Sequence, residues 1–156
     1  MLTLYASMYT VYNKHYIAHP LDKAWDFFAN PYNAIITSPP SLLTDVDDSA
    51  PSQVTDGHEF NYKINIFPVL SSEVKTMIIQ FQQKRRIVRQ QVAGPFKHWQ
   101  FELEFLDNGK DVEVHEKITY LPPYGKFGEF LDPVFIRPQI KKYLRYRSEK
   151  INKLFG

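Results

Sequence analysis

The sequence predicts an α+β fold: a curved antiparallel sheet of six or seven strands, two short helices, and a long C-terminal helix over the concave face of the sheet. Three observations lead to this prediction. Apolar and polar residues alternate through much of residues 41–123, which indicates strands with one covered face. Residues 132–155 carry an apolar stripe at helical spacing, formed by Ile136, Ile140, Tyr143, Leu144, Ile151, Leu154 and Phe155. A sheet with one apolar face needs a cover, and only this last helix is long enough.

The N-terminal region predicts one strand and two short helices. Residues 2–17 are rich in Tyr and Thr and contain no Gly or Pro, which favours a long strand. His19-Pro20 ends it, and residues 21–29 then place apolar side chains on one side at helical spacing: Leu21, Ala24, Trp25 and Phe28. Asn30-Pro31 ends that helix, and residues 32–36 are expected to form a second helical turn.

The central region predicts a meander of antiparallel strands. The pair Asn108-Gly109 is the strongest local hairpin signal in the chain. The alternation assigns the following residues to the covered face: Phe60, Tyr62, Ile64 and Ile66; Trp99, Phe101, Leu103 and Phe105; Val112, Val114, Ile118 and Tyr120. Met77, Ile79 and Phe81 share one parity, and we expect them to join this face if their strand is in register.

The long C-terminal helix predicts a cavity beneath it. One helix cannot fill a strongly curved sheet, and large aromatic side chains on both sides would hold the two layers apart. The alternative is that these side chains simply fill the core. The residues expected to bind a ligand there are Phe60, Tyr62, Ile64, Met77, Ile79, Trp99, Phe101, Leu103, Glu116, Ile118, Tyr120, Ile136, Ile140, Tyr143, Leu144 and Arg147.

Composition limits the function classes. The chain has 156 residues, 19 basic and 17 acidic, which suits one domain over residues 1–156 and gives no reason to expect nucleic acid as a partner. There is no cysteine, which excludes disulfides, thiolate nucleophiles and zinc fingers. No apolar run reaches the ~20 residues of a membrane span. The first basic residue is Lys14, so the start lacks the layout of a secretory signal and a cytoplasmic location is expected.

Several segments, in chain order, resemble motifs of the START-related, birch-pollen-allergen-like (SRPBCC) proteins. They are Ile17-Ala18-His19-Pro20, Ala24-Trp25-Asp26-Phe27-Phe28, Asn30-Pro31-Tyr32-Asn33, Ser38-Pro39, Val92-Ala93-Gly94-Pro95-Phe96-Lys97-His98-Trp99, Glu116 to Pro123 with Gly125 and Gly128, and Tyr146-Arg147. The resemblance implies a helix-grip fold. Its members include lipid carriers, hormone receptors and polyketide cyclases, so it does not choose one activity. Two residues depart from the usual pattern. His19 replaces the usual residue before the proline, and Glu116 stands where Asp is more common.

Glu116 is the most informative polar residue. Its parity with Val114 and Ile118 places a carboxylate on the covered face, where an unpaired charge is expensive. Arg147 lies on or beside the apolar stripe of the last helix and is positioned to form a bidentate pair with it. This pair either ties the helix to the sheet or binds a polar group of a ligand.

Other motifs favour structural interpretations. The histidines do not form a site, because His15 and His19 lie at a strand end rather than on a helix face. Residues 45–56 begin like a calcium loop but lack the required glycine, so no metal is expected. The basic cluster Lys84-Arg85-Arg86 with Arg89 is interpreted as a solvated turn, with an anionic head group, a membrane surface or nucleic acid as the alternative. Residues 122–128 are expected to form a loop, either a connector or a lid.

The sequence therefore predicts a protein that binds, and in one version transports, a hydrophobic or amphipathic small molecule, with no cofactor. One alternative is a polyketide cyclase or dehydrase that uses the same cavity, with Glu116, Arg147 or tyrosines moving a proton. The second is an interaction module with a collapsed cavity. The sequence does not determine the oligomeric state.

Overall fold

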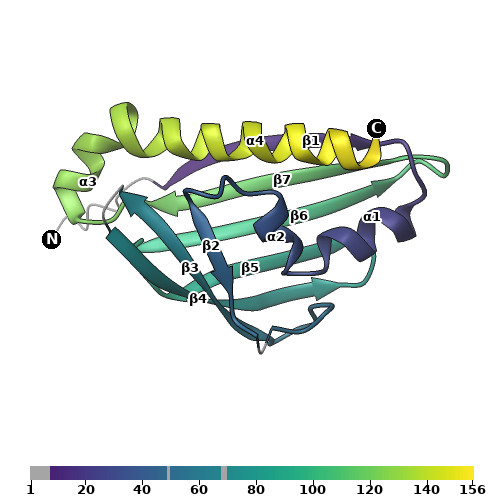
Figure 1. The fold of residues 1–156 in the computed structure, drawn as a ribbon, viewed down its shortest axis with the longest axis horizontal. Helices are drawn as coiled ribbons and strands as arrows, with labels where there is room; N and C mark the ends of the chain where they lie inside the picture. The colour runs from purple at the N-terminus through teal and green to yellow at the C-terminus, as the bar shows by residue number, and fades with distance from the viewer. Residues whose placement is uncertain (1–7, 49, 68–69) are drawn as a thin grey trace, which may run out of the picture.

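A computed structural model describes residues 8–48, 50–67 and 70–156, and its strands form one antiparallel sheet in the order β1-β7-β6-β5-β4-β3-β2 (Figure 1). The strands are β1 (Tyr9–Ile17), β2 (Leu43–Val46), β3 (Glu59–Phe67), β4 (Leu70–Gln82), β5 (Arg86–Ala93), β6 (His98–Asp107) and β7 (Val112–Leu121). The predicted antiparallel sheet of six or seven strands is confirmed, and the sheet has seven. Of the strand expected over residues 2–17, residues 2–7 lie outside the described residues.

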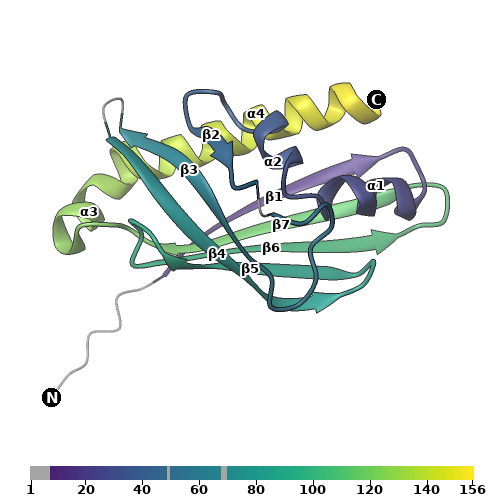
Figure 2. The ribbon, with the colours of Figure 1, turned by 60° about the horizontal axis from the view of Figure 1, so that its bottom comes forward.

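The helices lie on one side of this sheet. They are α1 (Leu21–Phe28), α2 (Asn33–Ile36), α3 (Gly125–Leu131) and α4 (Arg137–Phe155), with one π-helical turn, η1 (Asp132–Ile136), between the last two. In Figure 2 the sheet curls beneath α4, and α1 and α2 occupy the same side. Pro138 stands in the first turn of α4, directly after the π-helical turn η1. The predicted cover by a long C-terminal helix is confirmed.

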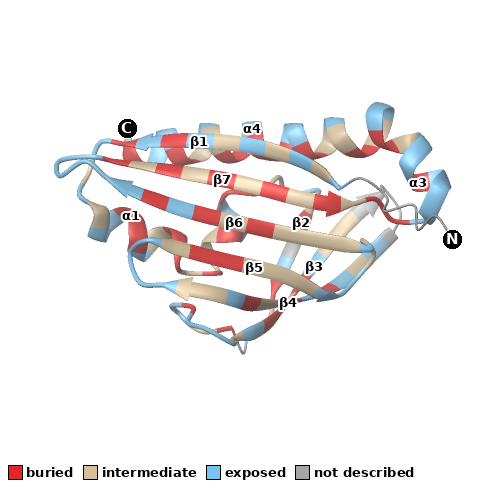
Figure 3. Ribbon diagram, turned by 180° about the vertical axis from the view of Figure 1, so that it is seen from behind, coloured by how far each residue is buried: buried red, intermediate tan, exposed pale blue. Residues whose placement is uncertain are grey.

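The core forms where the sheet meets α1 and α4. On α1, Ala24, Trp25 and Phe28 are buried, as the helical spacing predicts. The Trp25 ring lies edge-on to Phe81 and Phe105, with ring centroids 5.6 and 5.0 Å apart. Seen from the other side, the strands show buried residues alternating with more exposed ones (Figure 3), the pattern of a sheet covered on one face.

Met77 and Ile79 do not lie on the inner face, contrary to the sequence prediction. Ile79 is 40% exposed, whereas Ile78 is 1% exposed and belongs to the core. The register of β4 against β5 shifts between Ile78 and Gln80, and such a bulge reverses the parity of every residue before it. Phe81 does pack against the core. Because Met77 and Ile79 are separated from Phe81 by even numbers of positions, the regular alternation assigned them to the same face, and the bulge makes this assignment wrong.

Two predictions near the C-terminus also need correction. Residues 122–128, expected to be a loop, include the start of helix α3. Gly128 permits this packing, because a Cβ there would lie 1.6 Å from the carbonyl oxygen of Pro123. Leu154, assigned to the apolar stripe of the last helix, is 51% exposed, whereas its neighbour Phe155 is buried.

Candidate ligand-binding site

A cavity lies between the sheet and the segment formed by η1 and the first turns of α4. Its volume is about 150 Å³. Its wall is mostly apolar and is formed by Ala34, Ser38, Leu42, Leu43, Tyr62, Ile64, Val74, Arg89, Gln91, Phe96, Trp99, Phe101, Phe135, Ile136, Gln139, Ile140 and Tyr143.

The predicted ligand-binding residues fall into four groups. Those at this cavity are Tyr62, Ile64, Trp99, Phe101, Ile136, Ile140 and Tyr143. Phe60 and Leu103 line a second, smaller space of about 20 Å³ near α1. Ile118, Tyr120, Leu144, Glu116 and Arg147 are buried but do not line the main cavity. Met77 and Ile79, as described above, fall outside the inner face.

Sequence reasoning missed much of the polar part of the wall. Arg89 was grouped with the basic turn, yet its side chain lines the cavity, and Gln91 follows it on the same face of β5. The alternation of Ile87, Arg89 and Gln91 was the available signal, because Ile87 is buried in the core. Gln139 on α4 was not singled out either.

Arg89 and Tyr62 form the main polar contact of the cavity. Nη1 of Arg89 donates a hydrogen bond of 3.0 Å to the Tyr62 hydroxyl oxygen. Burial raises the pKa of the Tyr62 hydroxyl, and the charge of Arg89 opposes this only in part. The phenol therefore stays protonated near neutral pH, and its own hydrogen remains available to donate.

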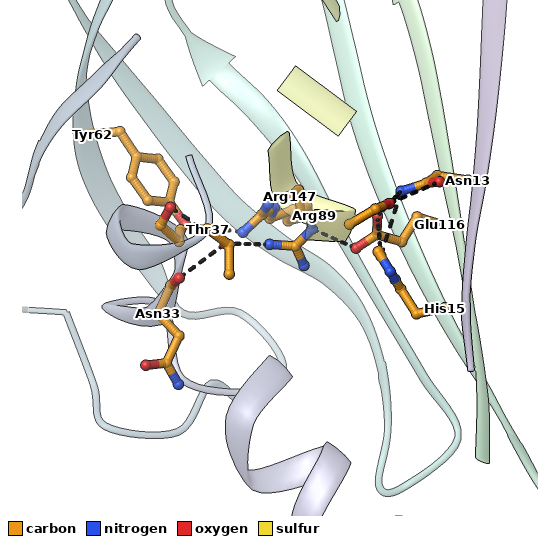
Figure 4. Close-up of polar contacts among 10 residues, drawn as sticks. Asn13, His15, Asn33, Thr37, Tyr62, Arg89, Glu116 and Arg147 are labelled. Carbon is orange, nitrogen blue, oxygen red and sulfur yellow. Dashed lines mark hydrogen bonds and ion pairs between the residues drawn. The ribbon is translucent and has the colours of Figure 1, made fainter. Parts of the chain in front are cut away.

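Glu116 and Arg147 meet as predicted, but not in a bidentate pair. Nε of Arg147 donates to Oε1 of Glu116 at 2.6 Å, while Nη1 donates to Thr37 Oγ1 at 2.6 Å. Thr37 in turn donates to the carbonyl oxygen of Asn33. Glu116 and Arg147 are 1% and 5% exposed. The arrangement joins α4, β7 and α2 (Figure 4).

The second carboxylate oxygen of Glu116 is bound from β1. His15 Nε2 lies 2.9 Å from Oε2, and Asn13 Nδ2 donates to the same oxygen at 3.1 Å. His15 is 2% exposed, and the sequence analysis did not anticipate its contact with Glu116. The pairing of Asn13 with Glu116 across β1 and β7 explains the contact. Together these residues form a buried group that we call the Glu116 network: Asn13, His15, Thr37, Glu116 and Arg147.

The electrostatics of this network hold Glu116 ionised. Burial alone would raise the pKa of Glu116, but the charge of Arg147 and the hydrogen bond from His15 overcome this and lower it to about 2 from its ordinary 4.5. A carboxylate saturated in this way has no proton to exchange near neutral pH. The network therefore positions the helix over the sheet and supports the wall of the cavity rather than supplying a base to it.

Glu116→Gln is expected to show a pH-dependent loss of stability. The folded-state pKa is below the unfolded one, so the stabilisation is complete above about pH 5 and is lost as the pH falls from 4.5 towards 2. At pH 7 the free energy of unfolding of the variant should be about 3 kcal/mol lower than that of the wild type. This difference between the two proteins should narrow below pH 4.5. Urea denaturation at a series of pH values measures this.

Glu113→Gln on the same strand is the matched control for this prediction. Its carboxylate pairs with Lys14 at the surface, 3.3 Å away, so we expect a much smaller difference between variant and wild type. A gap between Glu116→Gln and wild type that stays constant from pH 7 to pH 2 would show that the carboxylate charge is not what stabilises the fold.

A second buried contact holds the far end of the cavity. The Tyr120 hydroxyl donates to Asp132 Oδ1 at 2.6 Å, and Arg137 Nη2 donates to Oδ2 at 2.7 Å. Burial, and then the hydrogen bond to Asp132, raise the pKa of Tyr120. Because Asp132 begins η1, this contact fixes the segment that presents Phe135 and Ile136 to the cavity.

Metal-binding clusters and membrane-spanning helices are both absent from the described part of the chain. No group of three or more His, Asp or Glu side chains within residues 8–48, 50–67 and 70–156 is arranged to hold a metal ion. Over the same ranges, no helix has the length and apolar character that crossing a bilayer requires.

Comparison with known proteins gives similarity in structure but not in sequence. No protein-family model and no curated protein matches the chain. TTHA0849 from Thermus thermophilus superimposes with a TM-score of 0.71 at 12% identity, over 95% of this chain and 100% of that one. The Zhui aromatase/cyclase from Streptomyces sp. R1128 superimposes with a TM-score of 0.68 at 13% identity, over 95% of this chain and 96% of that one. A point mutant of norcoclaurine synthase from Thalictrum, in complex with a transition-state analogue, superimposes with a TM-score of 0.65 at 11% identity. The match covers 96% of this chain and 98% of that one.

At these identities the similarity shows the fold alone. The antiparallel sheet, the two short helices after β1, and the long C-terminal helix over the sheet agree with the arrangement that the sequence motifs implied. This chain therefore has a helix-grip fold, which it shares with these solved structures.

Proposed function

We propose that this protein binds a small hydrophobic or amphipathic molecule in the cavity between the sheet and the η1–α4 segment. The observation that carries the proposal is the wall: aromatic and aliphatic side chains surround about 150 Å³ of space, with a few polar groups at fixed positions. Pockets of this composition bind ligands by removing apolar surface from water, at roughly 25 cal/mol per Å².

The structural neighbours are compatible with this proposal. One is called an aromatase/cyclase, and another was solved with a transition-state analogue bound. The protein-contact alternative assumed a collapsed cavity, and the space beside Ile140 and Trp99 argues against it. The cyclase alternative loses two of its proposed groups, because Glu116 and Arg147 are paired with one another and lie outside the cavity wall.

Filling the cavity should weaken ligand binding. Ile140→Trp adds a large ring where Ile140 faces the cavity, and we expect the affinity for 2-naphthylmethanol, a neutral probe, to fall at least about tenfold because the apolar contact area is lost. Isothermal titration calorimetry at 25 °C measures the dissociation constant for wild type and variant.

Leu154→Trp is the matched control, because Leu154 lies on the same helix but is exposed to solvent. It should leave the affinity unchanged. Equal loss in both variants, or binding by Ile140→Trp that equals the wild type, would place the probe elsewhere and refute the proposed site. No binding of neutral or charged naphthalene probes by the wild type would refute the proposed function.

A further inference from the structure

We propose that the molecule bound in the cavity carries a carboxylate and that Arg89 binds it, with the Tyr62 hydroxyl as a second donor. This inference rests on the proposed function, because it describes the ligand of the same cavity. It identifies the ligand as an amphipathic organic acid with an apolar body.

The Arg89 side chain enters the cavity from the sheet. It stands on β5 directly opposite Phe101 of β6, and its guanidinium carbon lies 4.4 Å from the centre of the Phe101 ring. Phe101 is 1% exposed and forms part of the cavity wall. Stacking on an aromatic face fixes the guanidinium while leaving its edge free to donate hydrogen bonds.

The charge of Arg89 has no protein counterpart in the described part of the chain. No carboxylate there lies within 4.0 Å of its guanidinium, and the hydrogen bond to Tyr62 uses one of its five N–H donors. The cavity wall includes no Asp or Glu. A partly buried cation of this kind favours an anion beside it.

The other inward arginine shows the contrast. Arg147 is matched by the carboxylate of Glu116 and also donates to Thr37, so its charge is compensated within the protein. Arg86, at the start of β5, pairs with Glu102. Arg89 is thus the arginine of this region whose compensation must come from a bound molecule or from solvent.

A carboxylate fits the donors present. Two N–H groups of a guanidinium match the two oxygens of a carboxylate. The Tyr62 oxygen already accepts from Arg89, so its hydrogen is free to donate to the same anion. The same cavity is lined by Phe96, Trp99 and Ile140, which suit an apolar body rather than a second charged group.

The test uses two molecules that differ in charge and have the same ring system. Isothermal titration calorimetry compares 2-naphthoate with 2-naphthylmethanol on wild type, Arg89→Met and Arg89→Lys at pH 7. Wild type should bind the acid at least about tenfold more tightly than the alcohol, the effect expected for a charge-assisted hydrogen bond. Arg89→Met should remove that preference, so that the acid and the alcohol bind with nearly equal affinity. Arg89→Lys should restore part of it.

Arg86→Met is the control for loss of a positive charge on the same strand. Arg86 does not line the cavity, so the preference for the acid should persist in this variant. Circular dichroism melting of each variant confirms that the folded protein is being titrated.

The outcomes separate the two proposals. Equal affinity of wild type for the acid and the alcohol would overturn the role of Arg89 while leaving the proposed function intact. A preference for the acid that survives in Arg89→Met would also overturn it, because the anion would then be bound elsewhere. Failure of wild type to bind either molecule would overturn the proposed function, and this inference with it.

Discussion

Replacing Arg147 with Met is expected to lower the free energy of unfolding by about 3 to 5 kcal/mol. The substitution leaves the Glu116 carboxylate buried without the cation that compensates it, and it also removes the donor to Thr37. Methionine retains much of the apolar stem, so the loss comes from charge rather than from volume. Urea denaturation monitored by circular dichroism at pH 7 measures the change.

The double variant Glu116→Leu with Arg147→Met tests the origin of this loss. It shows whether the ion pair itself stabilises the fold, or whether the loss comes only from leaving one charge buried without its partner. Removing both charges eliminates the unpaired carboxylate, so the double variant should recover much of the stability lost by the single one. A double variant as unstable as the sum of both single variants would mean that the two side chains do not interact as the structure places them. Lys14→Met, which breaks a surface pair with Glu113, should have little effect.

Trp25→Ala is expected to destabilise the protein by a similar amount, about 3 to 5 kcal/mol. Trp25 is 3% exposed and packs between Phe81 and Phe105, so its removal leaves a void where α1 meets the sheet. It does not line the ligand cavity. Because the two sites share no partner, affinity for 2-naphthylmethanol should stay within about twofold of wild type in the folded protein.

Trp99→Ala, the same type of substitution at the cavity, should affect ligand binding more than Trp25→Ala does and stability less. Trp99 is only half-buried but lines the cavity beside Phe96, with ring centroids 4.8 Å apart. We expect a smaller loss of stability and a loss of roughly 1 to 2 kcal/mol in binding free energy. If Trp25→Ala weakened binding as strongly as Trp99→Ala, the separation between the folding core and the ligand cavity would be wrong.

The architecture followed from the sequence because its signals are local. The spacing of Ala24, Trp25 and Phe28 predicted α1, and Asn108-Gly109 predicted the hairpin between β6 and β7. Helix α3 could not be predicted in this way. It lies in a segment with glycines at Gly125 and Gly128, and glycine disfavours helices. The close approach of Gly128 to Pro123 becomes evident only in three dimensions.

Prediction of the site was more uneven. Parity placed Glu116 inside, and helical spacing placed Arg147 opposite it, because each follows from a single regular element. His15 was missed because the contact depends on which strand pairs with β7. Met77 and Ile79 were misplaced because one bulged residue reverses the alternation, and no residue type in that segment marks the bulge.

Arg89 illustrates the limit of grouping residues by charge. In the sequence it stands close to Lys84, Arg85 and Arg86, so it was interpreted with them as a solvated turn. The turn side chains of Lys84 and Arg85 are indeed exposed, but Arg89 lies two strand positions beyond the core residue Ile87 and therefore points inward. Face assignment within a strand decides its environment more strongly than neighbouring charges do.

The most direct test of the cavity is an NMR measurement of contacts between a bound ligand and isoleucine methyl groups. With methyl-labelled protein and unlabelled 2-naphthoate, we predict intermolecular nuclear Overhauser effects to Ile64, Ile136 and Ile140, which line the cavity, and none to Ile151, which is buried elsewhere along α4. Contacts restricted to the exposed Ile79, or no contact at the three cavity residues at saturating ligand, would contradict the account.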